Sequence, residues 1–219
     1  ETVKIKPQNS SNFVLPVQHV NRPHLDFRGY SGTIASGNIK VGQEIINFPS
    51  KQIAKIKEVF IGDKSIKSAS FRNSVTLTLD KEIDISRGDV LCKKDELVEI
   101  ADQFNVNMIW MADEKCFPGR SYIAKMHNNS TSVKILEIKK LYNVNTLEHR
   151  PSKELQLNDV AEVTISLNKS IPYMNYQDNK SLGSMILIDP LSNQTIGVGM
   201  INFSLRRAQN IHLQSLSIN

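Results

Sequence analysis

The sequence of 219 residues has no long uncharged hydrophobic run and almost no cysteine. No segment approaches the roughly 18 apolar residues that a membrane helix needs, and residues 1–4 hold no apolar core of a signal peptide. Cys92 and Cys116 are too few for a disulfide framework. These absences predict a cytoplasmic protein in a reducing compartment, with no membrane partner. The first residue is Glu1 rather than methionine, from which we expect a chain trimmed at both ends.

Sequence motifs for phosphate binding and for catalysis are missing as well. The glycine-rich segment 29–37 fits neither Gly-x-Gly-x-x-Gly nor Gly-x-x-x-x-Gly-Lys-Ser/Thr, and Asn38 follows it where a phosphate-binding lysine would stand. No Gly-x-Ser-x-Gly motif and no catalytic cysteine signature occurs. We therefore expect no catalytic and no cofactor-binding residues, and we interpret the glycines as turn and barrel-corner positions.

A metal site is not predicted either. His19 and His24 lie five residues apart with Asp26 nearby, but zinc needs a third and a fourth ligand close at hand. Cys92 and Cys116 show no such spacing. Histidines on a surface or at an interface are the simpler interpretation.

The charge of the chain does not indicate a nucleic-acid-binding protein, although its net charge is +5. Up to Gln103 there are 15 Lys and Arg against 13 Asp and Glu, and after it 12 against 9. A nucleic-acid-binding surface needs its positive charge clustered, whereas this excess is spread over both halves. We therefore expect no nucleic-acid partner.

Short segments with strand character, separated by turns, are what the sequence has instead. Residues 74–79 alternate strictly, so Val75, Leu77 and Leu79 face the same way, as in a half-buried antiparallel strand. Similar segments recur about every ten residues, a spacing typical of sandwiches and barrels. They lie at 13–17, 31–37, 39–41, 44–48, 53–60, 106–111, 121–126, 132–138, 159–167, 184–189 and 196–201.

The organisation predicted from these segments is all-β, with two consecutive antiparallel barrels. Residues 95–103 are the one stretch with helical character, and we interpret them as the connection between the barrels, able to form a helical turn. The predicted domains are 1–103, a first barrel with the linker, and 104–219, a second barrel with a C-terminal tail.

The candidate interaction surface is the most polar loop between strand-like segments, formed by Arg22, His24, Asp26 and Arg28. A proline interrupts this loop and glycines follow it, which implies a backbone held in a fixed path. The two arginines can offer forked, charge-assisted contacts to a partner that carries carboxylates. The alternative is a solvated loop in which Arg28 pairs with Asp26 or Asp84.

Segment 13–47 resembles the second domain of translational GTPases of the elongation factor Tu type. That domain begins with a Phe-x-x-Pro strand, which Phe13 and Pro16 match, and continues through turn glycines to a Lys-Val-Gly segment. The matching positions are Gly29, Gly32, Gly37 and Val41-Gly42. Residues 83–91 are similar to the closing strand of the same domain, and residues 195–201 to the last strand of the third domain.

Within that superfamily the sequence resembles the large subunit of sulfate adenylyltransferase. The most specific likeness is Asn21-Arg22-Pro23 followed by Asp26-Phe27-Arg28-Gly29-Tyr30. Residues 110–112 and 188–193 look similar to that subunit too. Residues 204–212 are similar to the segment that precedes an adenylylsulfate kinase domain in bifunctional members, although no kinase sequence follows.

The resemblance implies a role in sulfate activation, in which ATP and sulfate give adenylylsulfate and pyrophosphate, driven by GTP hydrolysis. It implies that GTP and Mg bind to a GTPase domain outside this chain, and that a separate small subunit carries the adenylyl transfer. This chain would then be a non-catalytic scaffold whose partners are its own GTPase domain and that small subunit. Two alternatives are an RNA- or protein-binding barrel pair of a translational GTPase and an independent enzyme.

Overall fold

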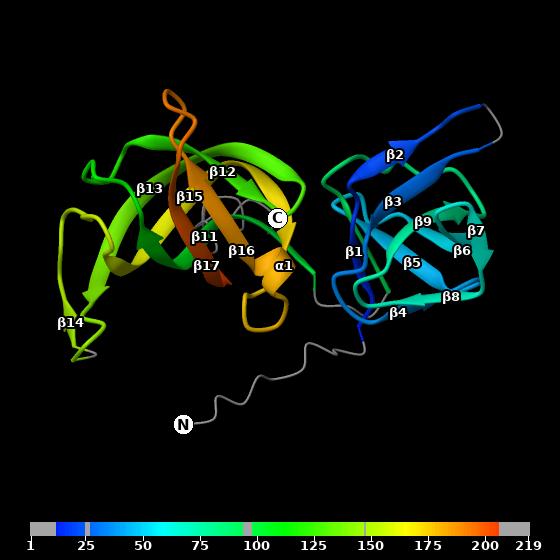
Figure 1. Cartoon of the computed structure of the whole chain (residues 1–219), viewed down its shortest axis with the longest axis horizontal. Helices are drawn as coiled ribbons and strands as arrows, with labels where there is room; N and C mark the ends of the chain where they lie inside the picture. The colour runs from blue at the N-terminus through cyan, green and yellow to red at the C-terminus, as the bar shows by residue number, and fades with distance from the viewer. Residues whose placement is uncertain (1–11, 25–26, 94–97, 147, 206–219) are drawn as a thin grey trace, which may run out of the picture.

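Almost the whole described chain is β-strand. The computed structural model describes residues 12–24, 27–93, 98–146 and 148–205 (Figure 1). These residues form 17 strands and one four-residue helix, α1 (Lys180–Gly183). The predicted all-β class is thereby confirmed. The described helix is too short and too polar to cross a membrane.

The N-terminal β-unit is built from β1 to β10. Its main sheet runs in the order β1-β10-β5-β6-β9-β3-β2, with β7 paired to β6, while β4 and β8 form a separate pair. The sheet curls so that Val14 forms a bridge with Ser36, just beyond the end of β3. The strands are β1 (Val14–Pro16), β2 (His19–Asn21), β3 (Gly29–Thr33), β4 (Asn38–Lys40), β5 (Glu44–Phe48), β6 (Ile53–Ile61), β7 (Lys64–Ile66), β8 (Ser68–Ser70), β9 (Ser74–Leu79) and β10 (Val90–Cys92).

The C-terminal barrel is built from β11 to β17 with α1. Its strands follow the order β12-β16-β17-β11-β15-β13, and β12 also pairs with β13, which closes six strands into a barrel. The short β14 extends β13 outside this ring. The strands are β11 (Glu99–Trp110), β12 (Ser121–Met126), β13 (Asn129–Tyr142), β14 (His149–Arg150), β15 (Val160–Tyr173), β16 (Ser184–Ile188) and β17 (Thr195–Ser204).

Side-chain alternation explains where the core of each unit lies. In β9, Val75 and Leu77 are buried and Leu79 packs against the same cluster, as the sequence pattern predicts. In the C-terminal barrel, Phe104, Val106, Met108 and Trp110 of β11 point inward at every second position. Each unit therefore has a hydrophobic core of its own.

The predicted helical turn within 95–103 is wrong for the residues that the structure describes there. Residues 94–97 lie outside the described residues, and β11 already begins at Glu99. Glu99 pairs with Tyr173 of β15, whose hydroxyl donates a 2.6 Å hydrogen bond to the Glu99 carboxylate. Pairing with a neighbouring strand has overridden a weak local helical pattern. The proposed division of the chain at 103/104 stays a prediction.

Two of the early glycines have the roles expected of corner positions, for different reasons. Gly37 has φ +68°, in the left-handed region that favours glycine. Gly32 lies inside β3, and a Cβ atom there would collide with the carbonyl oxygen of Pro16. Close approach of two backbones, rather than a positive φ, therefore requires glycine at position 32.

The two units meet at a junction that is buried and hydrogen-bonded. A third hydrophobic cluster joins Val14, Phe48, Val90 and Cys92 of the N-terminal β-unit to Val98 and Leu182. Figure 1 shows α1, which carries Leu182, on the side of the C-terminal barrel that faces the N-terminal β-unit. Two amide side chains cross the junction: Asn179 Nδ2 donates to Ser36 Oγ (3.4 Å) and Asn129 Nδ2 donates to the Gly88 carbonyl (2.7 Å).

Candidate functional site

The polar loop predicted from the sequence is the tip of the β2–β3 hairpin. Asn21, the last residue of β2, pairs directly with Gly29, the first residue of β3. Figure 1 places this hairpin on the side of the N-terminal β-unit that points away from the C-terminal barrel. Arg22, His24 and Arg28 are described, whereas Asp26 lies outside the described residues.

Arg22 and Arg28 converge on one carboxylate, that of Glu82. Arg22 Nη2 lies 3.6 Å from Glu82 Oε1, and Arg28 Nη1 lies 3.6 Å from Glu82 Oε2. The side chains of Arg22, Arg28 and Glu82 are 47%, 26% and 62% exposed, so each pair is worth under about 1 kcal/mol. The expected solvated-loop pairing of Arg28 with Asp84 is not what the structure shows.

Aromatic rings support the base of this loop. The rings of His24 and Phe27 lie 6.0 Å apart, and Phe27 lies 6.2 Å from Phe60 on β6 in an edge-on arrangement. The Arg28 guanidinium lies over the Tyr30 ring at 5.8 Å. Burial raises the pKa of Tyr30, with Arg28 acting in the opposite direction. Arg28 is thus held by an aromatic face as well as by Glu82.

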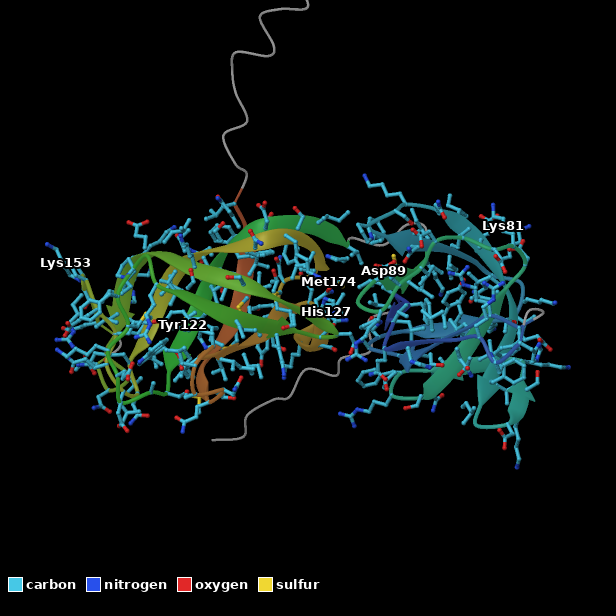
Figure 2. All side chains as sticks on the ribbon, turned by 90° about the horizontal axis from the view of Figure 1, so that it is seen from above. Lys81, Asp89, Tyr122, His127, Lys153 and Met174 are labelled. Carbon is cyan, nitrogen blue, oxygen red and sulfur yellow. The ribbon has the colours of Figure 1, made fainter. Side chains whose placement is uncertain are left out.

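A shallow pocket of about 160 Å³ opens beside these residues. Its charged lining consists of three cations and three carboxylates, namely Arg28, Lys57, Lys81, Glu58, Asp80 and Glu82. Figure 2 labels Lys81 at the outer edge of the N-terminal β-unit. These six charged side chains, balanced in sign, are suited to exchanging ion pairs with a partner protein. They include no activated nucleophile.

Glu82 is the residue that sequence reasoning missed. The signal is the pairing of β3 with β9, in which Gly29 lies opposite Thr78. This antiparallel register brings the residues after β9 beside those before β3, so the side chain of Glu82, a few residues past the end of β9, can reach Arg28. The segments are more than fifty residues apart in the chain, and only the pairing connects them.

The histidines do not gather into a metal site in the part of the chain that is described. Among residues 12–24, 27–93, 98–146 and 148–205, no group of three or more His, Cys, Asp or Glu side chains is placed to hold a metal ion. His19 lies on the edge strand β2, whereas His24 contacts Phe27 in the loop.

A second polar feature, His127, lies at the junction of the two units, as Figure 2 shows. Its Nε2 lies 3.1 Å from the Pro172 carbonyl oxygen, so this nitrogen carries the proton and donates it. Nδ1 is buried and has no hydrogen-bond partner among the described residues. Burial lowers the pKa of His127 to about 4, although the bond to Pro172 acts to raise it and Lys169 acts to lower it further.

We expect His127 to make the stability of the chain depend on pH. Between about pH 6.5 and 4 the unfolded chain protonates this histidine and the folded chain does not. The free energy of unfolding should therefore decrease as the pH is lowered from about 6.5 to about 4. The full loss would approach about 3 kcal/mol at the acid end. Urea denaturation at several pH values should show a shallower pH dependence for His127→Asn, which tolerates the φ of +38° at this position.

The exposed His149 provides the control for this measurement. The variant His149→Asn should keep the pH dependence of the unaltered chain. If the free energy of unfolding of His127→Asn changed with pH as steeply as that of the unaltered chain, His127 would not be the cause of the pH dependence.

Three comparisons connect this geometry to known proteins. A family model described as GTP-eEF1A C-terminal domain-like matches residues 103–202. Sulfate adenylyltransferase subunit 1 of Saccharophagus degradans is 40% identical over 92% of this chain, and that of Colwellia psychrerythraea is 38% identical over 100% of it. The bifunctional enzyme NodQ of a Rhizobium strain is 40% identical over 94% of this chain. This chain spans only 43%, 47% and 32% of those relatives, respectively.

Solved structures agree with the fold at lower sequence identity. Sup35 in complex with GMPPNP superposes with a TM-score of 0.81 at 16% identity, over 94% of this chain and 50% of Sup35. The elongation factor SelB of Methanococcus maripaludis gives 0.74 at 19% identity, over 93% of this chain and 45% of SelB. These likenesses show the fold of translational GTPases.

Proposed function

The chain is related over nearly its whole length to the sulfate adenylyltransferase subunit 1 family, and on this premise we propose that it is the two-barrel part of a GTP-hydrolysing large subunit of sulfate adenylyltransferase. The observation that carries the proposal is identity of about 40% extending over 92% of the chain or more. The parent enzyme would join ATP and sulfate into adenylylsulfate, with release of pyrophosphate. The chain itself would be a scaffold without catalytic groups.

In this proposal the two units transmit the state of a GTPase domain to a small catalytic subunit. The junction supports such a role, because Leu182 is fully buried there and Asn129 bonds across it to Gly88. Units packed in this way move together more readily than units joined only by a linker. Arg22, His24, Asp26 and Arg28 are the proposed contact surface, with GTP and Mg held in the domain outside this chain.

The parent protein would work in a reducing, cytoplasmic compartment. Cys92 and Cys116 are both buried and do not form a disulfide bond, which suits such surroundings. A pair of barrels that binds RNA or protein in a translational GTPase is the second candidate, and the superposition on Sup35 favours it. Identity of 16% to that protein against about 40% to the sulfate-activating relatives makes it the weaker one.

Isothermal titration calorimetry of the 219-residue chain with GTP and with ATP tests the scaffold assignment. We expect no binding with a dissociation constant of about 1 µM or better, because the sequence has no Gly-x-x-x-x-Gly-Lys-Ser/Thr motif. The helix that the structure describes, α1, has only four residues, and Asn179 already accepts hydrogen bonds from its first N–H groups. Tight binding of either nucleotide would contradict the proposal, since the chain would then contain a high-affinity site for a nucleoside triphosphate. A longer protein that includes the preceding GTPase domain is the positive control.

A further inference from the structure

A pocket of about 380 Å³ lies between the N-terminal β-unit and the C-terminal barrel. The N-terminal β-unit lines it with residues from the ends of β1 and β3 and from the turn before β9. The C-terminal barrel contributes the β12–β13 turn, which includes His127, and Ser181 of α1. In Figure 2, His127 lies where the two units meet. Small-molecule sites are often found at such boundaries between units.

Arg72 is the one formal charge that lines this pocket at neutral pH. No aspartate or glutamate is among the described lining residues, and the depressed pKa of His127 keeps its ring neutral. Arg72 has no ion pair among the described residues, and its guanidinium lies 5.1 Å from the centre of the Phe71 ring. In the pocket of about 160 Å³ beside the β2–β3 hairpin, by contrast, the three cations are matched by three carboxylates in the same lining. This electrostatic setting favours an anionic ligand with a single strongly charged group.

Three further polar side chains line the pocket and have no hydrogen-bond partner among the described residues. They are the amides of Gln18 and Asn128 and the hydroxyl of Ser181. An amide side chain both donates and accepts hydrogen bonds. Gln18 and Asn128 can therefore bind a ligand whose edge carries both a hydrogen-bond donor and an acceptor. Thr33 and His127 also line the pocket, and its apolar walls include Pro16, Ile34 and Phe71.

The backbone at two points of the rim is in the left-handed region. Arg72 has φ +69° and His127 has φ +38°. Arg72 is held there by a hydrogen bond from its N–H to the Ile34 carbonyl (3.0 Å). Residues other than glycine adopt this region only where the surrounding structure fixes them, and such positions concentrate at ligand sites. The backbone of Arg72, which lines the pocket, is therefore fixed by this turn.

We propose that this pocket binds a purine nucleoside monophosphate. The phosphate pairs with the Arg72 guanidinium, whose forked donors suit an oxyanion. Asn and Gln amides pair with the donor and acceptor groups on a purine edge, a role open to Gln18 and Asn128. The flat base packs on the apolar wall at Phe71. One cation suits a monophosphate better than a triphosphate, whose further charges would stay unpaired.

Binding at this pocket is independent of the proposed function. Calorimetry of the 219-residue chain with AMP as the probe tests whether the pocket binds a purine nucleoside monophosphate. We expect a dissociation constant on the order of 0.1–1 mM for AMP, and binding at least about tenfold weaker for adenosine and for inorganic phosphate. Arg72→Ala should weaken AMP binding by about tenfold and leave the weak adenosine signal unchanged, because only the phosphate contact is lost. Asn128→Ala should weaken both AMP and adenosine.

Arg150→Ala is the matched control, because Arg150 is an exposed arginine on β14, in the part of the C-terminal barrel far from the junction (Figure 1). This variant should bind AMP as the unaltered chain does. All variants should keep the melting temperature of the unaltered chain, which separates lost binding from lost folding. The proposal is overturned if AMP gives no heat up to about 5 mM, if Arg72→Ala binds AMP unchanged, or if phosphate alone binds as tightly as AMP.

Discussion

Replacing Leu182 with alanine should lower the free energy of unfolding by about 2–4 kcal/mol, because the change removes a fully buried side chain and leaves a cavity. Leu182 belongs to the hydrophobic cluster that joins α1 to Val14, Phe48 and Val90 of the N-terminal β-unit. The helix itself should survive, since the Asn179 side chain still accepts hydrogen bonds from the N–H groups of Ser181 and of residue 182. Urea denaturation of the chain measures the loss.

Leu191→Ala is the control for this effect. Leu191 is 86% exposed on the turn between β16 and β17, so the same chemical change should alter stability by less than about 0.5 kcal/mol. Equal losses for the two variants would show that the junction is not packed as the structure has it. Limited proteolysis adds a second readout, because a loosened junction should raise the rate at which a protease cleaves the chain.

The proposed function predicts that, in an enzyme reassembled from the full-length large subunit and a small subunit, Arg22→Ala together with Arg28→Ala lowers GTP-driven adenylylsulfate synthesis by about tenfold or more. Two charge-assisted contacts to the partner would be lost, each worth roughly 1.5–3 kcal/mol when shielded from water. The melting temperature of the isolated chain should hardly change, since the ion pairs of both arginines with Glu82 are exposed. The measurement is the yield of adenylylsulfate per GTP hydrolysed.

Glu82→Gln separates a coupling role from a structural one. It removes the internal carboxylate and leaves both arginines free to meet a partner, so coupling should be kept. Lysine at positions 22 and 28 should restore coupling only in part, because an ammonium group lacks the fork of a guanidinium. If the double alanine variant couples normally, or if it melts much earlier, the hairpin is structural and the proposed contact surface is wrong.

Much of the fold could be predicted because the strands carry their own pattern. The expected strand 121–126 is β12 itself, and the strict alternation of 74–79 gives β9 and its buried face. The short strands β2, β7, β8 and β14 were missed, since three or two residues hold too little periodicity to be recognised. The helical character expected near 95–103 failed because ladder pairing with β15 decided the conformation of Glu99 and its neighbours.

The candidate surface could be predicted in part. Arg22, His24 and Arg28 do lie together on one hairpin, which their closeness in the sequence implies. Glu82 and the lining of the pocket between the two units could not be found, since Gln18, Arg72 and Asn128 are brought together by pairings and packing across long stretches of chain. Local sequence patterns do not indicate which distant strands pair, and so they do not indicate which of these residues meet.

Closure of the C-terminal barrel has a consequence for how a partner could recognise it. Strand β12 is bonded to β16 on one side and to β13 on the other, which closes the ring and leaves few free backbone edges. Between its pairings with β12 and with β14, residues 136–140 of β13 are paired with β15 alone. Strand addition by another chain is therefore limited to this short stretch of β13, because the two-residue β14 is too short to serve as a template. A partner must then recognise the barrel mainly through side chains and loops, where single substitutions can change the affinity. Closure of the ring also disfavours edge-to-edge aggregation.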